Sequence, residues 1–148
     1  MHPKRLARGR RVDNTISIIV LSIAVMLWVA AFDVVYALQD IQVDRKEGLF
    51  SIPSSFGFKN ARIISILMHL ISVFLFSYFA FLINAGWIYW IGLFLFSFFV
   101  ALQHIRIKKQ DLSNINILFF TYNGIASIVF STLTILDIFV DIDIFLLN

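Results

Sequence analysis

The chain has 148 residues, of which 60% are hydrophobic and 14% are charged, with a net charge of +3 and no cysteine. A mean hydropathy of +0.90 lies well outside the range of soluble globular domains and predicts an all-α transmembrane protein. The absence of cysteine excludes a disulfide framework and a thiolate metal site. No helix-turn-helix pattern or aromatic-interleaved basic surface is present, so we expect the basic clusters to face membrane lipid and expect no nucleic-acid partner.

The first predicted element is a spanning helix over residues 15–40, preceded by a basic segment over residues 1–14. The stretch from Thr15 to Phe32 carries no charge, and a helix of this length rises roughly 27 Å, close to the thickness of a hydrocarbon core. Helical register continues to about Asp40, where we expect the helix to reach the membrane surface.

A polar connection is expected next, over residues 41–61. It contains Gly48, Pro53 and Gly57, which favour turns over helix interiors. Connections of this length often carry function.

Three further spanning helices follow. The residues between Arg62 and Arg106 are uncharged and are interrupted by the turn sequence NAGW. The pattern predicts helices over residues 62–83, 87–105 and 113–136. The acidic and apolar tail after them fits either an interfacial segment or a frayed helix end.

Four spans place the chain termini and the NAGW turn on one side and the 41–61 connection on the other. These sides hold five and seven of the twelve Lys and Arg residues. We expect an integral membrane protein of a bacterial inner membrane, and the positive-inside rule places the acidic connection in the cytoplasm. All five charges on the opposite side lie in residues 1–14, which suggests that this segment is not the native context of the first helix.

Three acidic residues, Asp33, Asp40 and Asp44, lie at the end of the first predicted helix. At about 100° per residue, their spacing of seven and four places them within about 20° of one face if the helix persists, with Tyr36 on the same side. A carboxylate at membrane depth costs about 3 kcal/mol on insertion scales. Three of them on one face imply a compensating cation or proton.

Oxygen ligands without Cys or His in this cluster favour a hard ion, Mg²⁺. Arg45 and Lys46 directly follow Asp44 and suit the recognition of a phosphate or diphosphate. Two other interpretations remain open at this point. Asp40 and Asp44 could be solvated at a helix end beside these basic residues, or the carboxylates could belong to an ion or proton carrier.

The segment DVVYALQDIQVDRKEGLFSIPSSFG, residues 33–57, resembles the second aspartate-rich motif of UbiA-type intramembrane prenyltransferases. That motif reads approximately DxxYAxxDxxxDxxxG, followed by a polar loop and FG. Downstream, QH at residues 103–104 and INILFFTYNGIAS at residues 115–127 are similar to the 4-hydroxybenzoate and menaquinone-type branch of the family.

The resemblance implies a nine-helix membrane bundle, of which residues 15–148 look like helices six to nine. It implies transfer of a polyprenyl group from a polyprenyl diphosphate to an aromatic acceptor of the 4-hydroxybenzoate or naphthoate type in quinone biosynthesis. It also assigns roles: Asp33, Asp40 and Asp44 as catalytic residues, Asp40 and Asp44 as Mg²⁺ ligands, and Tyr36, Arg45 and Lys46 as substrate-binding residues.

One part of the family pattern is missing, because no NxxxDxxxD motif occurs in the sequence. We therefore expect this chain alone to be inactive and to require a separate N-terminal half. A non-catalytic membrane subunit or gene remnant is the remaining alternative.

Other polar residues in the apolar segments have simpler interpretations. His69 and His104 are expected to be hydrogen-bonded packing residues rather than metal ligands. Asn123 and Gly124 suggest close helix packing with an interhelical hydrogen bond.

Overall fold

The computed structural model describes residues 3–107 and 115–147, and all the secondary structure of this part of the chain is helical. The elements in chain order are α1 (Pro3–Tyr36), the 3-10 helix η1 (Ala37–Asp40), α2 (Ile41–Glu47), α3 (Ile52–Ile83), α4 (Trp87–Arg106) and α5 (Ile115–Leu147). Within the described residues, four segments are long and apolar enough to cross a membrane: Thr15–Glu47, Ile52–Ile83, Trp87–Arg106 and Phe120–Val140. The predicted all-α transmembrane fold with four spans is confirmed.

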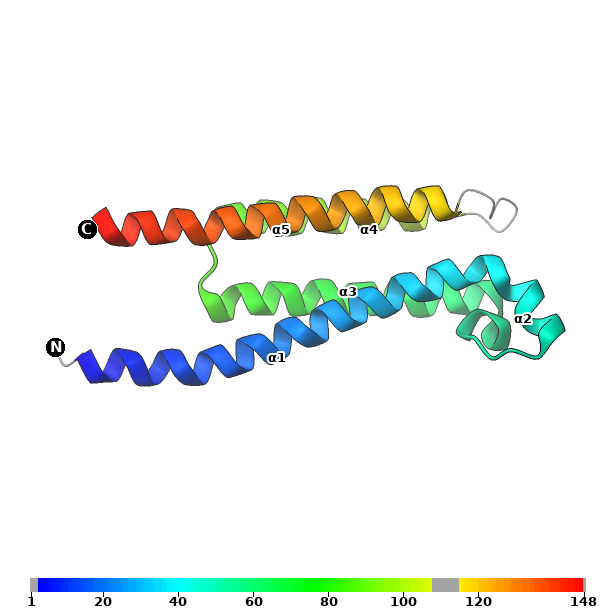
Figure 1. The fold of residues 1–148 in the computed structure, drawn as a ribbon, viewed down its shortest axis with the longest axis horizontal. Helices are drawn as coiled ribbons and strands as arrows, with labels where there is room; N and C mark the ends of the chain where they lie inside the picture. Colours follow the sequence, from blue (N-terminus) through cyan, green and yellow to red (C-terminus); the bar gives the residue numbers. More distant parts are fainter. Residues whose placement is uncertain (1–2, 108–114, 148) are drawn as a thin grey trace.

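The long helices run along a common direction (Figure 1). Both chain termini and the turn between α3 and α4 lie at one end, and α2 lies at the other, as the predicted order of spans requires. The most extensive packing joins α1 to α3 and α4 to α5, so the molecule consists of two helix pairs that meet less extensively.

Small side chains join α1 to α3. The hydroxyl of Ser65 donates a hydrogen bond to the carbonyl of Ala31 at 2.6 Å, and that of Ser72 donates to the carbonyl of Ala24 at 2.7 Å. Both alanines are fully buried. In a bilayer, where apolar burial does not drive helices together, such close backbone approach and hydrogen bonds hold a pair.

The α4 and α5 helices approach closely at Gly92. A Cβ atom at this position would lie 3.1 Å from Cβ of Leu133 and 3.3 Å from Cδ2 of Phe130. At Gly124, by contrast, a Cβ atom would meet nothing within 4 Å, and the described residues offer the Asn123 side chain no hydrogen-bond partner. The Asn123 side chain is buried, but the interhelical hydrogen bond predicted for it is not found among the described residues. The close approach predicted at Gly124 lies at Gly92 instead.

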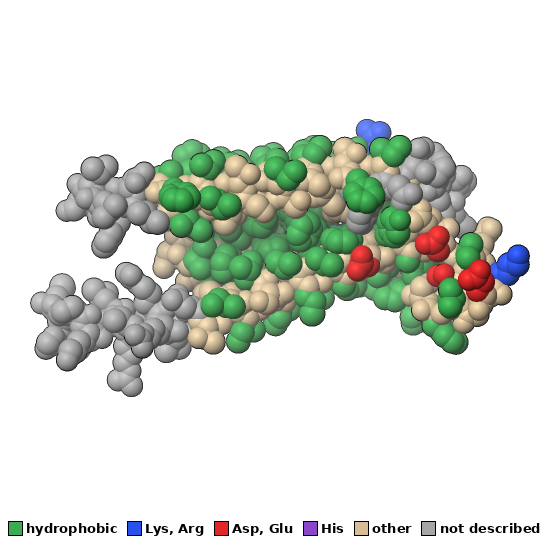
Figure 2. All heavy atoms as spheres, viewed as in Figure 1, with side chains coloured by type: hydrophobic (Ala, Val, Ile, Leu, Met, Phe, Trp, Pro, Cys, Tyr) green, Lys and Arg blue, Asp and Glu red, His purple; other side chains and the backbone are tan. Residues whose placement is uncertain are grey.

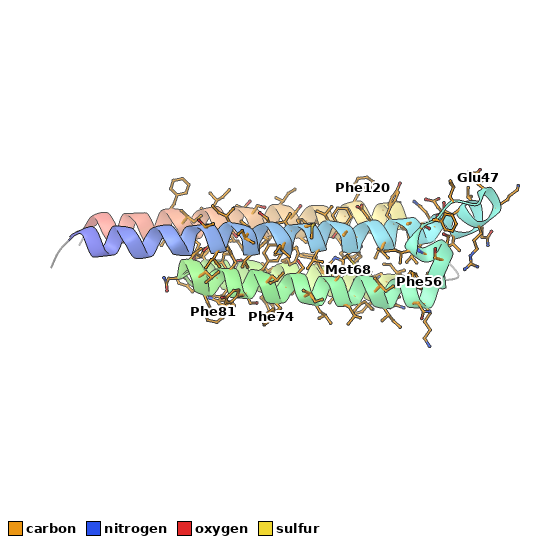
Figure 3. The ribbon with its side chains drawn as sticks, turned by 90° about the horizontal axis from the view of Figure 1, so that it is seen from below. Glu47, Phe56, Met68, Phe74, Phe81 and Phe120 are labelled. Atoms are coloured by element: carbon orange, nitrogen blue, oxygen red, sulfur yellow. The ribbon has the colours of Figure 1, made fainter. Side chains whose placement is uncertain are left out.

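Aromatic rings occupy both the core and the outer surface. Phe130 packs against Phe76, Tyr89 and Phe96 with ring-centroid distances of 5.1, 5.3 and 5.3 Å, which joins α3, α4 and α5. Phe74 points outward from α3 (Figure 3). Such outward rings suit contact with lipid.

The predicted polar connection over residues 41–61 is mostly helical in the structure, because its turn-forming residues act as helix caps. Gly48, at φ 70°, ends α2 in the left-handed conformation that glycine adopts without strain. Ser51 begins α3 through a reciprocal capping box with Ser54, with a proline in the first turn. Gly57, at φ 77° and ψ 167°, then bends α3. Only a short turn separates α2 from α3.

Two other boundaries also differ from the prediction. The first helix begins at Pro3 rather than near residue 15, and the last continues to Leu147 rather than ending near residue 136. The segment added to the first helix is basic, and the segment added to the last helix is acidic. The acidic segment contains no proline or glycine. The basic segment contains Gly9 and Pro3, and Pro3 stands at the first helical position, where proline is tolerated.

Candidate functional site

Acidic side chains gather at the end of the molecule where α1, η1 and α2 follow one another (Figure 2). Asp33 lies in the last turn of α1, Asp40 ends η1, and Asp44 lies in α2. Asp33 and Asp40 are exposed, whereas Asp44 is half-buried. The prediction of one common face assumed a continuous α-helix, and η1 interrupts that register with its tighter turn.

A hydrogen bond orients the carboxylate of Asp44. The hydroxyl of Ser51 donates to Oδ2 of Asp44 at 2.6 Å, and the same hydroxyl oxygen accepts the backbone N–H of Ser54 at 3.1 Å. Ser51 thus caps α3 and holds Asp44 with one side chain. The sequence analysis did not identify Ser51, although a hydroxyl residue before an apolar run is a recognisable N-cap signal.

The basic residues of the cluster, Arg45 and Lys46, lie in the last helical turn of α2. Nε of Arg45 donates to the carbonyl of Ser54 at 2.9 Å, so α3 positions this guanidinium. A Cβ atom at Gly57 would lie 3.8 Å from Nη2 of Arg45, which places the guanidinium beside the bend in α3. Lys46 is exposed. Glu47 follows at the outer tip of α2 (Figure 3).

An apolar base supports this polar turn. Val34, Val35 and Leu38 are buried on the inner side of α1 and η1, and they pack in one cluster with residues of α3, α5 and the end of α4. Tyr36, which directly follows Val35, is 38% exposed. The buried residues hold the backbone of the aspartate motif in place, while Asp33, Tyr36 and Asp40 reach the surface.

The carboxylates of Asp40 and Asp44 are oxygen ligands of the kind that Mg²⁺ prefers. Among the described residues, no three His, Cys, Asp or Glu side chains are gathered closely enough to hold a metal ion. Mg²⁺, however, commonly takes only one or two protein carboxylates together with waters and substrate phosphates. Asp40 and Asp44 can supply two carboxylates, one of them oriented by Ser51.

A second polar contact joins the two helix pairs. Nδ1 of His69 and Nε2 of His104 lie 3.0 Å apart in the buried region between α3 and α4. Nη2 of Arg62 donates to the carbonyl of His104 at 2.6 Å. The two histidines are hydrogen-bonded packing residues, as predicted. Their mutual contact, across 35 positions of sequence, had no signal in the sequence.

Comparison with known proteins gives a consistent result. Residues 7–125 match the model of the UbiA prenyltransferase family. The chain is 30% identical over 108 residues to a 4-hydroxybenzoate octaprenyltransferase of Psychromonas ingrahamii, an alignment that covers 73% of this chain and 37% of that enzyme. No solved structure matches the chain. The chain spans little more than a third of the length of this relative and belongs to the UbiA prenyltransferase family.

Proposed function

We propose that this chain supplies the second aspartate motif of a Mg²⁺-dependent enzyme that transfers a polyprenyl group from a polyprenyl diphosphate to an aromatic acceptor. Membership of the UbiA family supports the reaction class, and the similarity to a 4-hydroxybenzoate octaprenyltransferase supports an acceptor of the 4-hydroxybenzoate or naphthoate type. The observation that carries the proposal is the hydrogen bond by which the hydroxyl of Ser51 orients the carboxylate of Asp44, next to Arg45 in α2.

Each residue of this turn has a proposed role. Asp40 and Asp44 would hold Mg²⁺, which when bound would neutralise negative charge on the diphosphate. Arg45 and Lys46 would bind diphosphate oxygens through charge-assisted hydrogen bonds. The two basic side chains would stabilise the charge that collects on the diphosphate as the allylic C–O bond breaks. The aromatic ring would then form a C–C bond to the allylic carbon, and the released diphosphate or water would accept the ring proton.

Asp33 and Tyr36 lie at the membrane end of the same motif. We propose that Asp33 belongs to the acidic lining of the site and that Tyr36 contacts the prenyl substrate near the surface, where a tyrosine presents both an apolar ring and a polar hydroxyl. The turn faces the cytoplasm of a bacterial inner membrane in this proposal, following the distribution of basic residues.

The site needs a second acidic motif. The sequence contains no NxxxDxxxD pattern, and the alignment covers 37% of the related enzyme. We propose that a separate N-terminal half carries this motif and that the chain has no transferase activity without it.

The geometry gives little support to an ion or proton carrier. Asp137 is the buried carboxylate among the described residues. Its two oxygens accept hydrogen bonds from the backbone N–H groups of Gly86 at 2.8 Å and Tyr89 at 3.1 Å. The carboxylate of Asp137 therefore accepts backbone N–H groups that would be unpaired at the beginning of α4. Its oxygens are not free to bind a transported ion.

A chimaera tests the proposal. This chain would replace the aligned segment of the Psychromonas ingrahamii enzyme, and prenylated 4-hydroxybenzoate would be measured in vesicles with Mg²⁺ or with a chelator. We expect Mg²⁺-dependent product that Asp44→Ala abolishes and the control Glu47→Gln retains. A chimaera that inserts in the membrane but forms no product, beside an active parent enzyme, contradicts the proposal.

The isolated chain, not joined to the related enzyme, provides a second measurement. Vesicles containing it should bind a labelled prenyl diphosphate weakly and only with Mg²⁺, and should form no product. Movement of an imposed ion gradient across these vesicles would support the carrier interpretation instead.

A further inference from the structure

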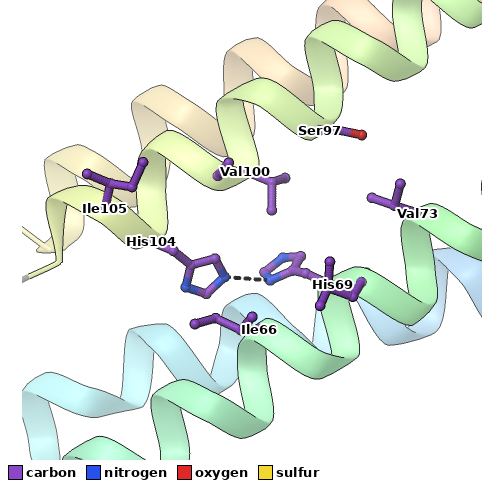
Figure 4. A pocket seen from close by; sticks show the side chains of 9 residues that line it. Ile66, His69, Val73, Ser97, Val100, His104 and Ile105 are labelled. Carbon is purple, nitrogen blue, oxygen red and sulfur yellow. Dashed lines mark hydrogen bonds between the residues drawn. The ribbon is translucent and has the colours of Figure 1, made fainter.

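A groove of about 280 Å³ lies between α3 and α4 (Figure 4). Ile66 and Val73 line it from α3, and Val100, Ala101 and Ile105 line it from α4. Sites that enclose a whole small molecule occupy about 300–1,000 Å³. The groove is therefore suited to a stretch of an apolar chain rather than to a complete substrate.

The groove opens toward the outer surface of the helices. Leu70 and Ile105 both line it and are 61% and 67% exposed. Both helices are membrane-spanning by length and composition. Side chains this exposed within spanning segments are accessible to lipid acyl chains.

Cationic side chains mark one end of the groove. Arg62 lies one helical turn before Ile66, on the same face of α3. Arg106 follows the lining residue Ile105 and is exposed, and Lys59 is exposed three residues before Arg62.

The charge of Arg62 is not balanced by the part of the chain that the structure describes. Its Nη2 donates to the carbonyl of His104, while its Nε is buried without a hydrogen-bond partner. The first turn of α3 contains no acidic residue. Nε has no accessible surface, so only the remaining N–H groups of this half-buried guanidinium can reach a ligand. A cation without a carboxylate partner among the described residues favours an anionic ligand, and the planar group suits phosphate oxygens.

We propose that the groove binds an acyl chain of an anionic membrane phospholipid whose phosphate lies against Arg62 and Arg106. Basic residues at the surface end of a groove between spanning helices are typical of anionic-lipid sites. This site is separate from the carboxylates of Asp40 and Asp44. Because the two helix pairs meet less extensively with each other than within each pair, the bound chain would also fill the space between α3 and α4.

The test measures lipid binding to the full chain in detergent by native mass spectrometry, with phosphatidylglycerol or phosphatidylcholine as the added lipid. We expect phosphatidylglycerol to bind at least about fivefold more tightly, the preference that one basic residue near a headgroup supplies. Arg62→Gln should remove about fivefold of that preference. Glu47→Gln changes the net charge by one unit at the same end of the molecule but away from the groove, and should retain the preference.

A second pair of variants tests the groove itself. Ala101→Phe fills the groove from α4 and should weaken the binding of both lipids, whereas Ser131→Phe adds the same ring to an exposed position of α5 and should not. Circular dichroism of each variant would establish that the helices are retained. If Arg62→Gln destroys the fold, Ala101→Phe and Arg106→Gln carry the test.

Three results would overturn the proposal: equal affinity for the two lipids, an unchanged preference in Arg62→Gln and Arg106→Gln, or unchanged lipid binding in Ala101→Phe. Displacement of bound phosphatidylglycerol from the wild-type groove by farnesyl diphosphate would also overturn it, because the groove would then belong to the prenyl donor. Lipid binding does not depend on transferase activity, so this test and that of the proposed function can fail independently.

Discussion

The hydroxyl of Ser51 donates a 2.6 Å hydrogen bond to Oδ2 of Asp44, and its oxygen accepts the N–H of Ser54. One side chain therefore begins α3 and orients a proposed Mg²⁺ ligand of α2. Ser51→Ala should lower turnover of the chimaera about 10- to 100-fold and raise the Mg²⁺ concentration needed for half-maximal rate, as expected for a residue that orients a metal ligand. Ser51→Thr should recover most of the rate.

Ser55→Ala is the matched control for Ser51, because Ser55 is exposed and no side-chain hydrogen bond joins it to the carboxylate in the described structure. Its turnover and Mg²⁺ dependence should match those of the unaltered chimaera. Equal Mg²⁺ dependence in the Ser51→Ala and Ser55→Ala variants would show that the hydroxyl does not position Asp44.

The two proposed metal ligands should be individually indispensable. Asp40→Ala and Asp44→Ala should each lower turnover by orders of magnitude, because either change leaves a single carboxylate from this motif for Mg²⁺. Steady-state rates at saturating Mg²⁺ would measure this. Near-normal turnover in either variant would rule out the assignment of that residue, with Glu47→Gln as a charge control that should stay active.

The carboxylate of Asp137 should stabilise the fold rather than serve the reaction. It accepts two backbone N–H groups at the beginning of α4, where a negative charge also interacts favourably with the helix dipole. Asp137→Ala should lower the free energy of unfolding by about 1–2 kcal/mol, the upper part of the range for a lost helix cap. Thermal unfolding in detergent would measure this loss of stability. Asp137→Asn should lose an intermediate amount, and the control Thr132→Ala should retain the stability of the unaltered chain.

Two glycines of the α4 and α5 pair should respond in opposite directions to alanine. Gly92→Ala should lower the unfolding midpoint, because the new Cβ would lie 3.1 Å from Leu133 Cβ and force the helices apart. Gly124→Ala meets nothing within 4 Å and should raise stability by up to about 1 kcal/mol through the higher helix propensity of alanine. Equal effects of the two changes would contradict the packing described for Gly92.

The contact between His69 and His104 should be measurable as a coupling between α3 and α4. A double-mutant cycle with His69→Phe and His104→Phe should give a coupling free energy of about 0.6 kcal/mol, the average for hydrogen bonds between membrane helices. Unfolding in detergent provides the four free energies. A coupling of zero would mean that the two rings pack without a stabilising hydrogen bond.

The composition and the uncharged stretches were sufficient to predict the class of fold and the four spans. A stretch such as Thr15–Phe32 has few stable structures in a bilayer other than a helix, because every backbone polar group must be satisfied within the segment. The predicted break at NAGW also agrees with the turn between α3 and α4. The motif that starts at Asp33 was sufficient to suggest the family, which the comparisons confirm.

Helix boundaries near the membrane surface were less predictable. The sequence predicted that Gly48 and Gly57 belong to a long polar loop. In the structure, Gly48 ends α2 and Gly57 bends α3. Residues that favour turns also favour helix caps, and the local sequence does not distinguish these uses.

The sequence by itself determined that the described part of the chain is a membrane protein with four helices long and apolar enough to span, and that it carries an aspartate motif at a helix end. Hydropathy and charge act locally along the chain, so their pattern is visible without the fold. Only the tertiary structure decided which polar side chains meet. Ser51 reaches Asp44, Asp137 reaches Gly86, and His69 reaches His104. The last two contacts depend on how helices distant in sequence pack. That packing is set by small residues and shape at the interfaces, which a pattern of apolar residues does not specify.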